Sequence, residues 1–422
     1  MKIPRFNIKF QTVLLWLLCF GLFNAFAGAW IVDGQSVQSL ELQLSAVNSG
    51  NGYRTVEVEA GSHPLANGKA LLTAYEQAKN MDPASGSEVC IILPPATYDL
   101  GDSVLVMDTD YINLSGARPV TLTMQGKVPV VWQDFDELLD TEIFVTNYAT
   151  SAILTGEVPQ STIVASGVTI SNTANRASVA FVKIEGEVFT SEHGAVIWEN
   201  VWLADRVDYG ARSSNTFIGV YAPMGICATK SGSPAAFLGR LENSVVIGDY
   251  CLGGSGGTVD GILVGNTITG IGCVGLGGVV KGSFTRNTII GDGCVGESGL
   301  IDGFFQGNTM AGLSCVGGSG GTINGTFIEN TILGSSCLGW DSGTVNAYFL
   351  RDQIIGASAL GECSVNAIFS HCTFRGAWQL MGGTLSSNAV FTLSDGLNPV
   401  VTNSPARIIY CSDANHNPLT NQ

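Results

Sequence analysis

Between about residue 227 and residue 395 the apolar residues of this chain return at a nearly constant interval. The phrase [VI]-x-[GA]-x-F, in which large apolar, small and aromatic residues alternate with other residues, recurs every 20 to 22 residues. Alternation with a period of two is typical of a strand with one buried face. We therefore predict one such strand per repeat, with the aromatic position in the core. The members of this position are Leu263, Phe284, Phe305, Phe327, Phe349, Phe369 and Phe391.

Two further columns of like residues follow the same interval. A second short strand, mostly T-[IM]-x-G, begins directly after an asparagine and leads to a cysteine. Residues one period apart lie over one another if each repeat is one coil, so each column predicts a ladder of stacked side chains. The asparagine column is Asn243, Asn266, Asn287, Asn308 and Asn330, continued by Asp352 and Cys372. The cysteine column is Cys227, Cys251, Cys273, Cys294, Cys315 and Cys337, followed by Ala359.

The repeat length decides which solenoid this is. Two or three short strands per 21 to 22 residues, separated by glycine turns, describe one coil of a solenoid. Left-handed hexapeptide helices use about 18 residues per turn, and leucine-rich repeats need a leucine framework that this chain lacks. The pattern therefore predicts an all-β protein built as a single-stranded, right-handed parallel β-helix.

The region before the repeats predicts an N-terminal cap. Leu71, Leu72, Tyr75 and Ala78 have helical spacing, and short apolar strands separated by Pro-Pro and Gly/Asp turns follow them. The segments "ALLTAYEQAKN", "VCIILPPATYDLGDSVLVM" and "YINLSGA" resemble the opening of pectin lyase-like proteins of the pectate lyase superfamily. This resemblance covers residues 66–117 and implies a capping helix before a right-handed parallel β-helix. It includes none of the catalytic residues of that superfamily, so it implies no activity.

The first 27 residues predict a secretory signal peptide. Lys2, Arg5 and Lys9 precede an apolar run of about 15 residues that ends in Ala25-Phe26-Ala27, which suits cleavage before Gly28. A membrane anchor is the alternative, but it needs roughly 20 apolar residues. We expect a secreted or cell-surface protein with no membrane insertion after cleavage. Its expected segments are the signal peptide 1–27, the N-terminal cap 28–121, irregular coils 122–226, regular coils 227–400 and a C-terminal cap or tail 401–422.

Composition and charge narrow the possible partners. Only 13% of the residues are charged, 45% are hydrophobic and 54 are glycine, which excludes a disordered chain. Loss of the signal peptide removes three basic residues and no acidic one, so the formal charge moves from −16 to −19. An acidic exterior argues against nucleic acid and anionic membranes as partners. It disfavours a polyanionic substrate as well, unless Ca²⁺ or a local basic cluster intervenes.

The cysteines are expected to be structural. Cysteine is a small side chain that tolerates burial, and neighbours in a ladder lie about 4.8 Å apart, beyond the usual Cβ separation of a disulfide. If disulfides form, Cys363 with Cys372 is the pair that we expect, because these two do not share the ladder. A straight row cannot converge on zinc, so we expect no metal site and no cofactor.

The outward positions of the regular coils are the first candidate for binding. The residue before each core aromatic faces outward and includes Phe304 and Tyr348, which can stack on sugar rings or contact a partner. A β-branched exterior that only favours strands is the alternative. The threonines before the second strand suggest an ice-binding row, but within that column only Thr267 with Thr269 forms a Thr-x-Thr pair.

The densest candidate for catalysis is the segment "ADRVDYGAR". Asp205 and Asp208 can act as an acid pair or hold Ca²⁺, Arg206 can bind a carboxylate, and His193 lies shortly before them. A solvated turn with a surface ion pair explains the same residues. No full motif of a lyase or polygalacturonase is present.

Two functions therefore stay open. The first is a non-catalytic protein at the cell surface or outside the cell, which presents a repetitive face for glycan binding, adhesion or matrix association. The second is a polysaccharide lyase or glycoside hydrolase of the pectin lyase-like class, with its cleft in residues 122–235 and with Ca²⁺ as a possible cofactor. The sequence leaves the ligand, the enzyme status and the oligomeric state open.

Overall fold

The computed structural model describes residues 54–116, 159–190, 196–209, 211–228, 235–334, 336–356, 358–375, 378–380, 383–397, 401, 404–413 and 415–419. The expected signal peptide, residues 1–27, lies outside these ranges. The chain divides into a unit that ends at Thr55 and a unit from Val56 to Gln422. Of the elements that the structure describes, the second unit contains the helix and, apart from the first residues of β1, all of the strands.

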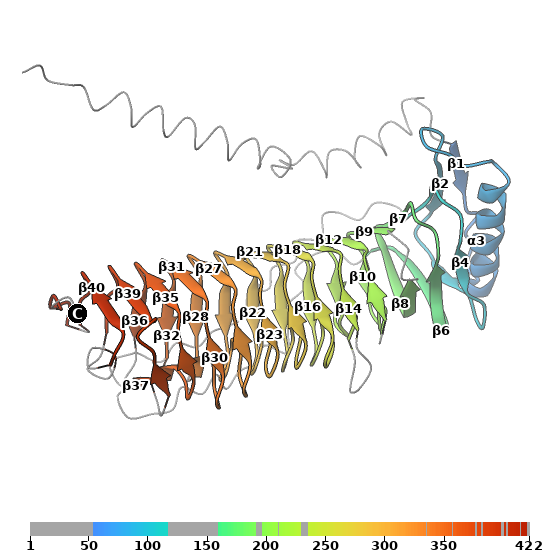
Figure 1. Cartoon of the computed structure of the whole chain (residues 1–422). Coiled ribbons are helices and arrows are strands. Elements are labelled where there is room, and N and C mark those ends of the chain that lie inside the picture. The colour runs from blue at the N-terminus through green and yellow to red at the C-terminus, as the bar shows by residue number, and fades with distance from the viewer. Residues whose placement is uncertain are drawn as a thin grey trace, which may run out of the picture. The chain divides into compact units, whose positions relative to one another are not determined.

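Parallel sheets run along the second unit, and consecutive regular coils add strands to the same sheets in the same order (Figure 1). Sheet 1 contains β1 (Arg54–Glu57), β2 (Val89–Leu93), β5 (Ile112–Gly116), β7 (Ala177–Ala180), β9 (Val196–Glu199), β12 (Thr216–Ile218), β15 (Arg240–Glu242), β18 (Ile262–Val264), β21 (Ser283–Thr285), β24 (Phe304–Gln306), β27 (Thr326–Ile328), β31 (Tyr348–Leu350), β35 (Ile368–Ser370), β39 (Val390–Thr392) and β40 (Arg407–Ile409).

The second long sheet follows sheet 1 in each coil. Sheet 2 contains β3 (Thr97–Asp99), β4 (Leu105–Met107), β6 (Ser161–Asn172), β8 (Val182–Thr190), β10 (Trp202–Leu203), β13 (Tyr221–Ala222), β16 (Val245–Ile247), β19 (Thr267–Thr269), β22 (Thr288–Ile290), β25 (Thr309–Ala311), β28 (Thr331–Leu333), β32 (Gln353–Ile355) and β36 (Thr373–Arg375).

The third sheet precedes sheet 1 in each coil, and a short fourth sheet lies between sheets 2 and 3 in the chain. Sheet 3 contains β11 (Arg212–Ser213), β14 (Ala236–Phe237), β17 (Thr258–Val259), β20 (Val279–Val280), β23 (Leu300–Ile301), β26 (Thr322–Ile323), β30 (Thr344–Val345), β34 (Ser364–Val365) and β38 (Thr384–Leu385). The fourth sheet contains β29 (Ser336–Leu338), β33 (Ser358–Leu360) and β37 (Trp378–Leu380). The predicted fold class, an all-β parallel β-helix, is confirmed.

The phenylalanine column forms the predicted stack in the core. From Phe284 to Phe391, successive rings of the column have centroids 4.6 to 4.8 Å apart and interplanar angles of 4° to 17°. All of these rings are buried. The separation equals the distance between strands, so each coil contributes one ring to a continuous interior stack.

The predicted strand [VI]-x-[GA]-x-F is in fact two strands. β17 ends at Val259 and β18 begins at Ile262, in different sheets, with the bend at Asp260 and Gly261. A Cβ atom on Gly261 would lie 2.5 Å from the carbonyl oxygen of Gly239. The small residue thus lets the bends of successive coils stack closely. Inward and outward side chains continue to alternate through the bend.

The asparagine ladder lies at the turn between sheets 1 and 2. The Nδ2 of Asn287 donates to the Oδ1 of Asn308 (3.0 Å), and the backbone N–H of Asn287 donates to the same oxygen (2.8 Å). Its Nδ2 also donates to the carbonyl of Leu263 (2.9 Å). Asn266, Asn308 and Asn330 make equivalent bonds. Asn243, predicted in this column, is exposed, and Ser244 takes its place, with its backbone N–H donating to the Oδ1 of Asn266 (2.9 Å). The ladder thus satisfies buried backbone groups at each turn.

The cysteine ladder is a row of buried free thiols from Cys251 to Cys337. Cys227, predicted as its first member, lies off the ladder, because Ile226 pairs with Leu252 and Gly225 therefore occupies the position of Cys251 in that coil. All ten cysteines that the structure describes are free and buried, including Cys363 and Cys372, so the disulfide considered for that pair does not form. Cys294 donates its thiol to the carbonyl of Cys315, with the sulfur 3.2 Å from the oxygen. Burial raises the pKa of the Cys227 and Cys251 thiols well above the usual value.

The predicted capping helix is α3 (Pro64–Lys79). Proline occupies its first turn, and its buried side includes Leu71, Tyr75 and Ala78, which belong to the same core as the strands. The hydroxyl of Tyr75 accepts the N–H of Thr109 (3.2 Å), which fixes the helix to the first coils. Figure 1 shows the helix beside the first strands, at the N-terminal end of the solenoid. None of the described helical residues form a helix long and apolar enough to cross a membrane.

Candidate functional site

The outward residues of the last regular coils form a grid of hydroxyl, amide and aromatic groups. Along β30, β31 and the bend between them, Thr344, Asn346 and Tyr348 point outward, because they alternate with the buried Val345 and Ala347. The parallel registers place the corresponding residues of the neighbouring coils beside them. We call the nine residues of three such coils the amide strip: Thr322, Asn324, Thr326, Thr344, Asn346, Tyr348, Ser364, Asn366 and Ile368.

The centre of the amide strip is a second asparagine ladder, which lies on the outside of the solenoid. The Nδ2 of Asn346 donates to the Oδ1 of Asn324 (3.0 Å), and the Nδ2 of Asn366 donates to the Oδ1 of Asn346 (3.1 Å). Asn324 and Asn346 are exposed and Asn366 is half-buried. An amide nitrogen has two hydrogens and an amide oxygen two lone pairs, so each ladder bond leaves one hydrogen and one lone pair unused by that bond.

The two aromatic residues predicted for binding lie on the same face of sheet 1. Phe304 is 37% exposed and Tyr348 is 38% exposed. Thr326 pairs with both of them, so one coil separates the two rings. Ile368, which is 43% exposed, lies next to Tyr348 in the following coil. Tyr348 therefore offers an open ring beside the amide of Asn346.

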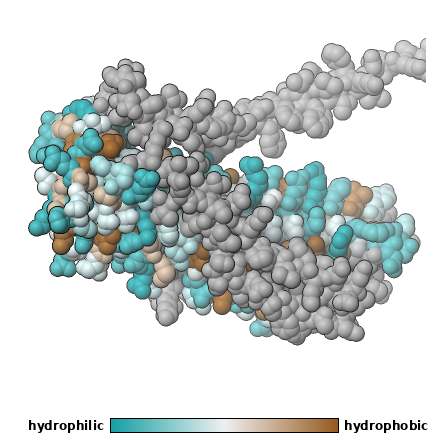
Figure 2. All heavy atoms as spheres, turned by 180° about the vertical axis from the view of Figure 1, so that it is seen from behind, coloured by the Kyte–Doolittle hydropathy of each residue, from teal (hydrophilic) through white to brown (hydrophobic). Residues whose placement is uncertain are grey.

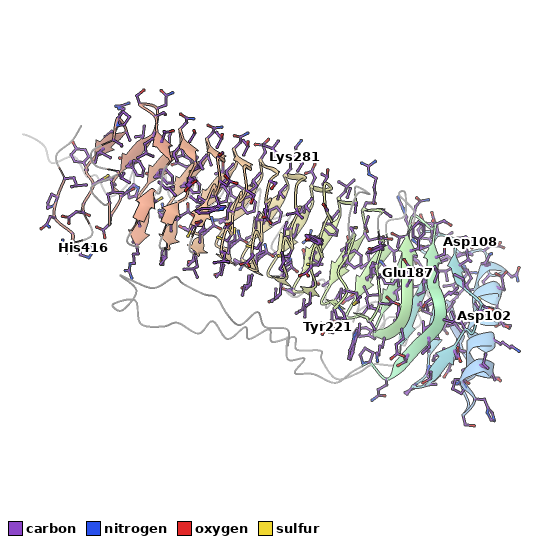
Figure 3. The ribbon with its side chains drawn as sticks, turned by 90° about the horizontal axis from the view of Figure 1, so that it is seen from below. Asp102, Asp108, Glu187, Tyr221, Lys281 and His416 are labelled. Atoms are coloured by element: carbon purple, nitrogen blue, oxygen red, sulfur yellow. The ribbon has the colours of Figure 1, made fainter. Side chains whose placement is uncertain are left out.

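Toward the N-terminus, the column of positions that contains Asn324, Asn346 and Asn366 is occupied by charged residues. Asp302, Lys281 and Asp260 occupy the positions of Asn324 in the three preceding coils, and all three are exposed. In Figure 3, Lys281 lies at one edge of the solenoid and Tyr221 lies at the opposite edge. The amide strip therefore continues a column that runs along one side of the solenoid.

The amide strip has the functional groups that recognise sugars. Amides and hydroxyls donate to and accept from ligand hydroxyls, and an exposed aromatic ring packs on an apolar ring face. On the face that Figure 2 shows, apolar residues occur mostly singly among hydrophilic ones, as in a surface that stays in water. Within the strip itself Ile368 is the one aliphatic side chain among nine residues, so the strip can bind a hydrated, ring-containing chain without a large apolar patch.

The predicted catalytic segment has a different environment. Asp208 is fully buried: its Oδ1 accepts the N–H of Thr190 (2.6 Å), and both of its oxygens accept the hydroxyl of Thr190 (2.8 and 2.7 Å). The Nδ2 of Asn215 donates to its Oδ2 (3.4 Å). Burial raises the pKa of Asp208 to about 6, although these hydrogen bonds lower it in part.

The other residues of that segment are nearer to the surface. The guanidinium of Arg206 lies 4.6 Å from the centroid of the Tyr209 ring, and Asp205 accepts the N–H of Arg206 through its own side chain (2.8 Å). His193 lies outside the described residues. The structure thus places Asp208 inside the solenoid and Asp205 on its surface, and it forms no open pair of these two carboxylates. Their catalytic role stays a prediction.

Two groups of residues were missed by the sequence analysis. The outer asparagines are visible in "TINGTF", "TVNAYF" and "SVNAIF", where Asn precedes the core phenylalanine by three residues. On the outer face of sheet 2, the Nζ of Lys183 lies 4.6 Å from the Trp202 ring, and the Trp202 and Tyr221 rings meet edge to face at 5.4 Å. These three residues recur every 19 residues, but they are of different types and this interval differs from that of the regular coils, so the columns of like residues did not include them.

Metal chemistry has no support from the described residues. Within the ranges that the structure covers, no three His, Cys, Asp or Glu side chains come together as a metal site. The structure therefore names no residues that would hold Ca²⁺.

Comparisons with known proteins give two similar solved structures. No family model and no curated protein matches the chain. The A-module of the mannuronan C-5 epimerase AlgE4 of Azotobacter vinelandii is 13% identical, with a TM-score of 0.37, over 86% of this chain and 94% of that one. The A-module of the mannuronan C-5 epimerase AlgE6 of the same organism is 11% identical, with a TM-score of 0.30, over 84% and 92%. At these values the similarities indicate no activity for this chain.

Proposed function

We propose that this protein is secreted or displayed at the cell surface and that its β-helix binds polysaccharide without catalysis. The observation that carries the proposal is the outer ladder of Asn324, Asn346 and Asn366 beside the exposed ring of Tyr348. The N-terminal residues 1–27 support export, because they have the basic, apolar and small-residue regions of a signal peptide.

A rigid solenoid suits this task. Backbone hydrogen bonds between coils and the inner asparagine ladder hold each outward side chain in register with the next. A ligand then meets groups that are already ordered, so binding costs little conformational entropy. Adhesion or matrix association follows from the same property, since several coils can bind one long chain.

Binding is tested on the full chain with a set of soluble polysaccharides, by affinity electrophoresis and by titration calorimetry. The Tyr348→Ala variant removes the open ring of the strip. We expect it to weaken binding about fivefold to tenfold, as expected for the loss of one stacking contact. Tyr410→Ala is the matched control, because Tyr410 is 71% exposed and lies outside the strip.

Two results would refute the proposed binding function. One is the absence of binding to every polysaccharide in the set by a folded protein. The other is an equal loss of affinity in Tyr348→Ala and Tyr410→Ala. Export is tested separately by sequencing the N-terminus of the protein recovered outside the cell, which we expect to begin at Gly28.

The second candidate function is polysaccharide cleavage. The observation in its favour is Asp208, because a carboxyl with a pKa of about 6 suits general acid catalysis. Against it, the hydrogen bonds to Thr190 and Asn215 hold that carboxyl inside the solenoid. Assays for reducing ends and for unsaturated products, with and without Ca²⁺, test it; product formation that Asp208→Ala abolishes would replace our first proposal.

A further inference from the structure

The groups of the amide strip repeat along the solenoid axis. Asn324, Asn346 and Asn366 present the same amide at successive coils, and adjacent strands lie about 4.8 Å apart. Hydroxyl groups repeat beside them: the Oγ of Ser364 lies 3.4 Å from the Oγ1 of Thr384 in the next coil. A ligand that uses several of these amides must therefore offer similar groups at intervals along its own length.

The ladder bonds themselves run along the axis. Each of Asn346 and Asn366 uses one amide N–H to reach the preceding asparagine. The second N–H of each amide points away from that bond, because the two hydrogens of an amide lie about 120° apart in one plane. The coils of Asn346 and Asn366 thus each keep one further amide donor, next to the hydroxyl of Thr344 or Ser364.

Charge decides which class of polymer suits the strip. All nine residues of the strip are neutral, and the exposed Asp341 and Glu362 lie in the turns that lead into β30 and β34. Asp302 precedes Asn324 in the same column, and the chain as a whole has a formal charge of −16. Cations occur further along the same columns, at Lys281 and Arg407, but the net charge of the chain is negative. This net charge disfavours a polyanion and leaves a neutral chain unaffected.

Resting on the binding function proposed above, we propose that the amide strip selects an uncharged polysaccharide and holds it parallel to the solenoid axis over at least three coils. Amides bind the hydroxyls of successive sugars, and Tyr348 packs on one ring face. Uronate polymers are excluded by the negative net charge of the chain and by the absence of a cation in the strip itself.

The test uses the full chain and measures affinity for two sets of probes. The neutral set is glucan, mannan and xylan with their oligosaccharides of increasing length, and the acidic set is polygalacturonate and alginate. We expect binding to the neutral set only, with an affinity that rises with length until the chain covers the three coils. That affinity should change little with salt, because no charge pairs form.

Asn346→Asp is the decisive variant, because it keeps the shape of the side chain and replaces the central amide donor with a charge. We expect it to lower the affinity for the neutral probe about fivefold to tenfold, by the loss of one hydrogen bond and the weakening of another. Asn415→Asp is the matched control, since it adds the same charge at an exposed position outside the strip. Asn415→Asp should unfold at the same denaturant concentration as the original protein, and Asn346→Asp, which loses its exposed bond to Asn324, should cost at most about 1 kcal/mol and stay folded in the assay.

The outcomes separate this inference from the function on which it rests. Binding of the acidic set in preference to the neutral set, or an affinity independent of oligosaccharide length, would overturn the inference and leave polysaccharide binding intact. No binding to either set would remove both. Self-association that Tyr348→Ala abolishes, in a protein that binds no glycan, would show that the strip contacts a second copy of the chain instead.

Discussion

The end of the inner asparagine ladder offers a sharp test of the stacked-coil geometry. Asp352 takes the place that asparagine occupies in the four preceding coils, and it is fully buried. Its Oδ1 accepts the N–H and the Nδ2 of Asn330 (2.7 and 2.8 Å), and its Oδ2 accepts the N–H of Leu350 (2.9 Å). A carboxylate has no hydrogen to offer the carbonyl that the preceding asparagines reach through Nδ2, which in this coil corresponds to that of Phe327.

The burial and the hydrogen bonds of Asp352 determine how much its charge destabilises the folded protein. Burial raises the pKa of Asp352 from 3.8 to about 7, and the bonds from Asn330 only partly oppose it. A shift of roughly three units corresponds to about 4 kcal/mol at neutral pH. Asp352→Asn removes this cost and loses the bond from Leu350, which is worth about 1 kcal/mol. We therefore expect the variant to be more stable by about 3 kcal/mol at pH 8.

The sign of the pH dependence follows from the raised pKa. Between the unfolded pKa near 4 and the folded pKa near 7, the folded chain holds a proton that the unfolded chain has released, so stability falls as pH rises through this window. The advantage of Asp352→Asn should therefore be small near pH 4, grow up to about pH 7 and stay constant above it. Glu199 and Asp208 also have raised pKa values, so the difference between the two proteins isolates Asp352.

Urea unfolding at pH 4, 6 and 8 measures the difference, and amide exchange of the Asn330 N–H reports it locally, because that N–H donates to Asp352. Asp302→Asn is the control, since Asp302 is exposed and outside the ladder. Equal stability of Asp352→Asn and the original protein at pH 8, or a lower stability of the variant, would refute the reasoning.

Two further variants and one labelling experiment test other parts of the fold. Phe327→Ala should destabilise the protein by about 3 to 5 kcal/mol in urea unfolding, because it removes a buried ring from the stack; a cost below about 1 kcal/mol would contradict the stacking. Gly291→Ala should prevent stable folding, since its Cβ would lie 1.8 Å from the carbonyl oxygen of Gly270, and normal yield and stability would contradict the close turn. The ten described cysteines should react with a thiol reagent only after denaturation, and rapid labelling of the native protein would show that the ladder is open.

Periodicity predicted the features that repeat in every coil. The rows of Phe305, Asn308 and Cys315 were recognised as ladders because each recurs at the same interval and each suits burial at one place in the coil. The bend between β17 and β18 was not predicted, because the alternation of inward and outward residues continues through it. Only the close approach of Gly261 to the preceding coil shows that a turn is needed there.

The site was less predictable than the fold. Tyr348 was expected to face outward, and it does, but the neighbouring Asn346 was overlooked because it occupies the variable position of the repeat. Asp208 is held by hydrogen bonds to Thr190 and Asn215, which are residues of other types, 18 and 7 positions away in the chain. Because these polar residues do not form a column of like residues, the repeat pattern did not reveal their contacts.

The central claim, that the amide strip binds a neutral polysaccharide along the solenoid axis, is tested most directly by a crystal structure. The crystal should contain the full chain with a neutral oligosaccharide long enough to cover three coils. We predict density for the sugar chain along Asn324, Asn346 and Asn366, parallel to the solenoid axis, with one ring packed on Tyr348. Sugar bound on another face, or lying across a single coil, would contradict the account.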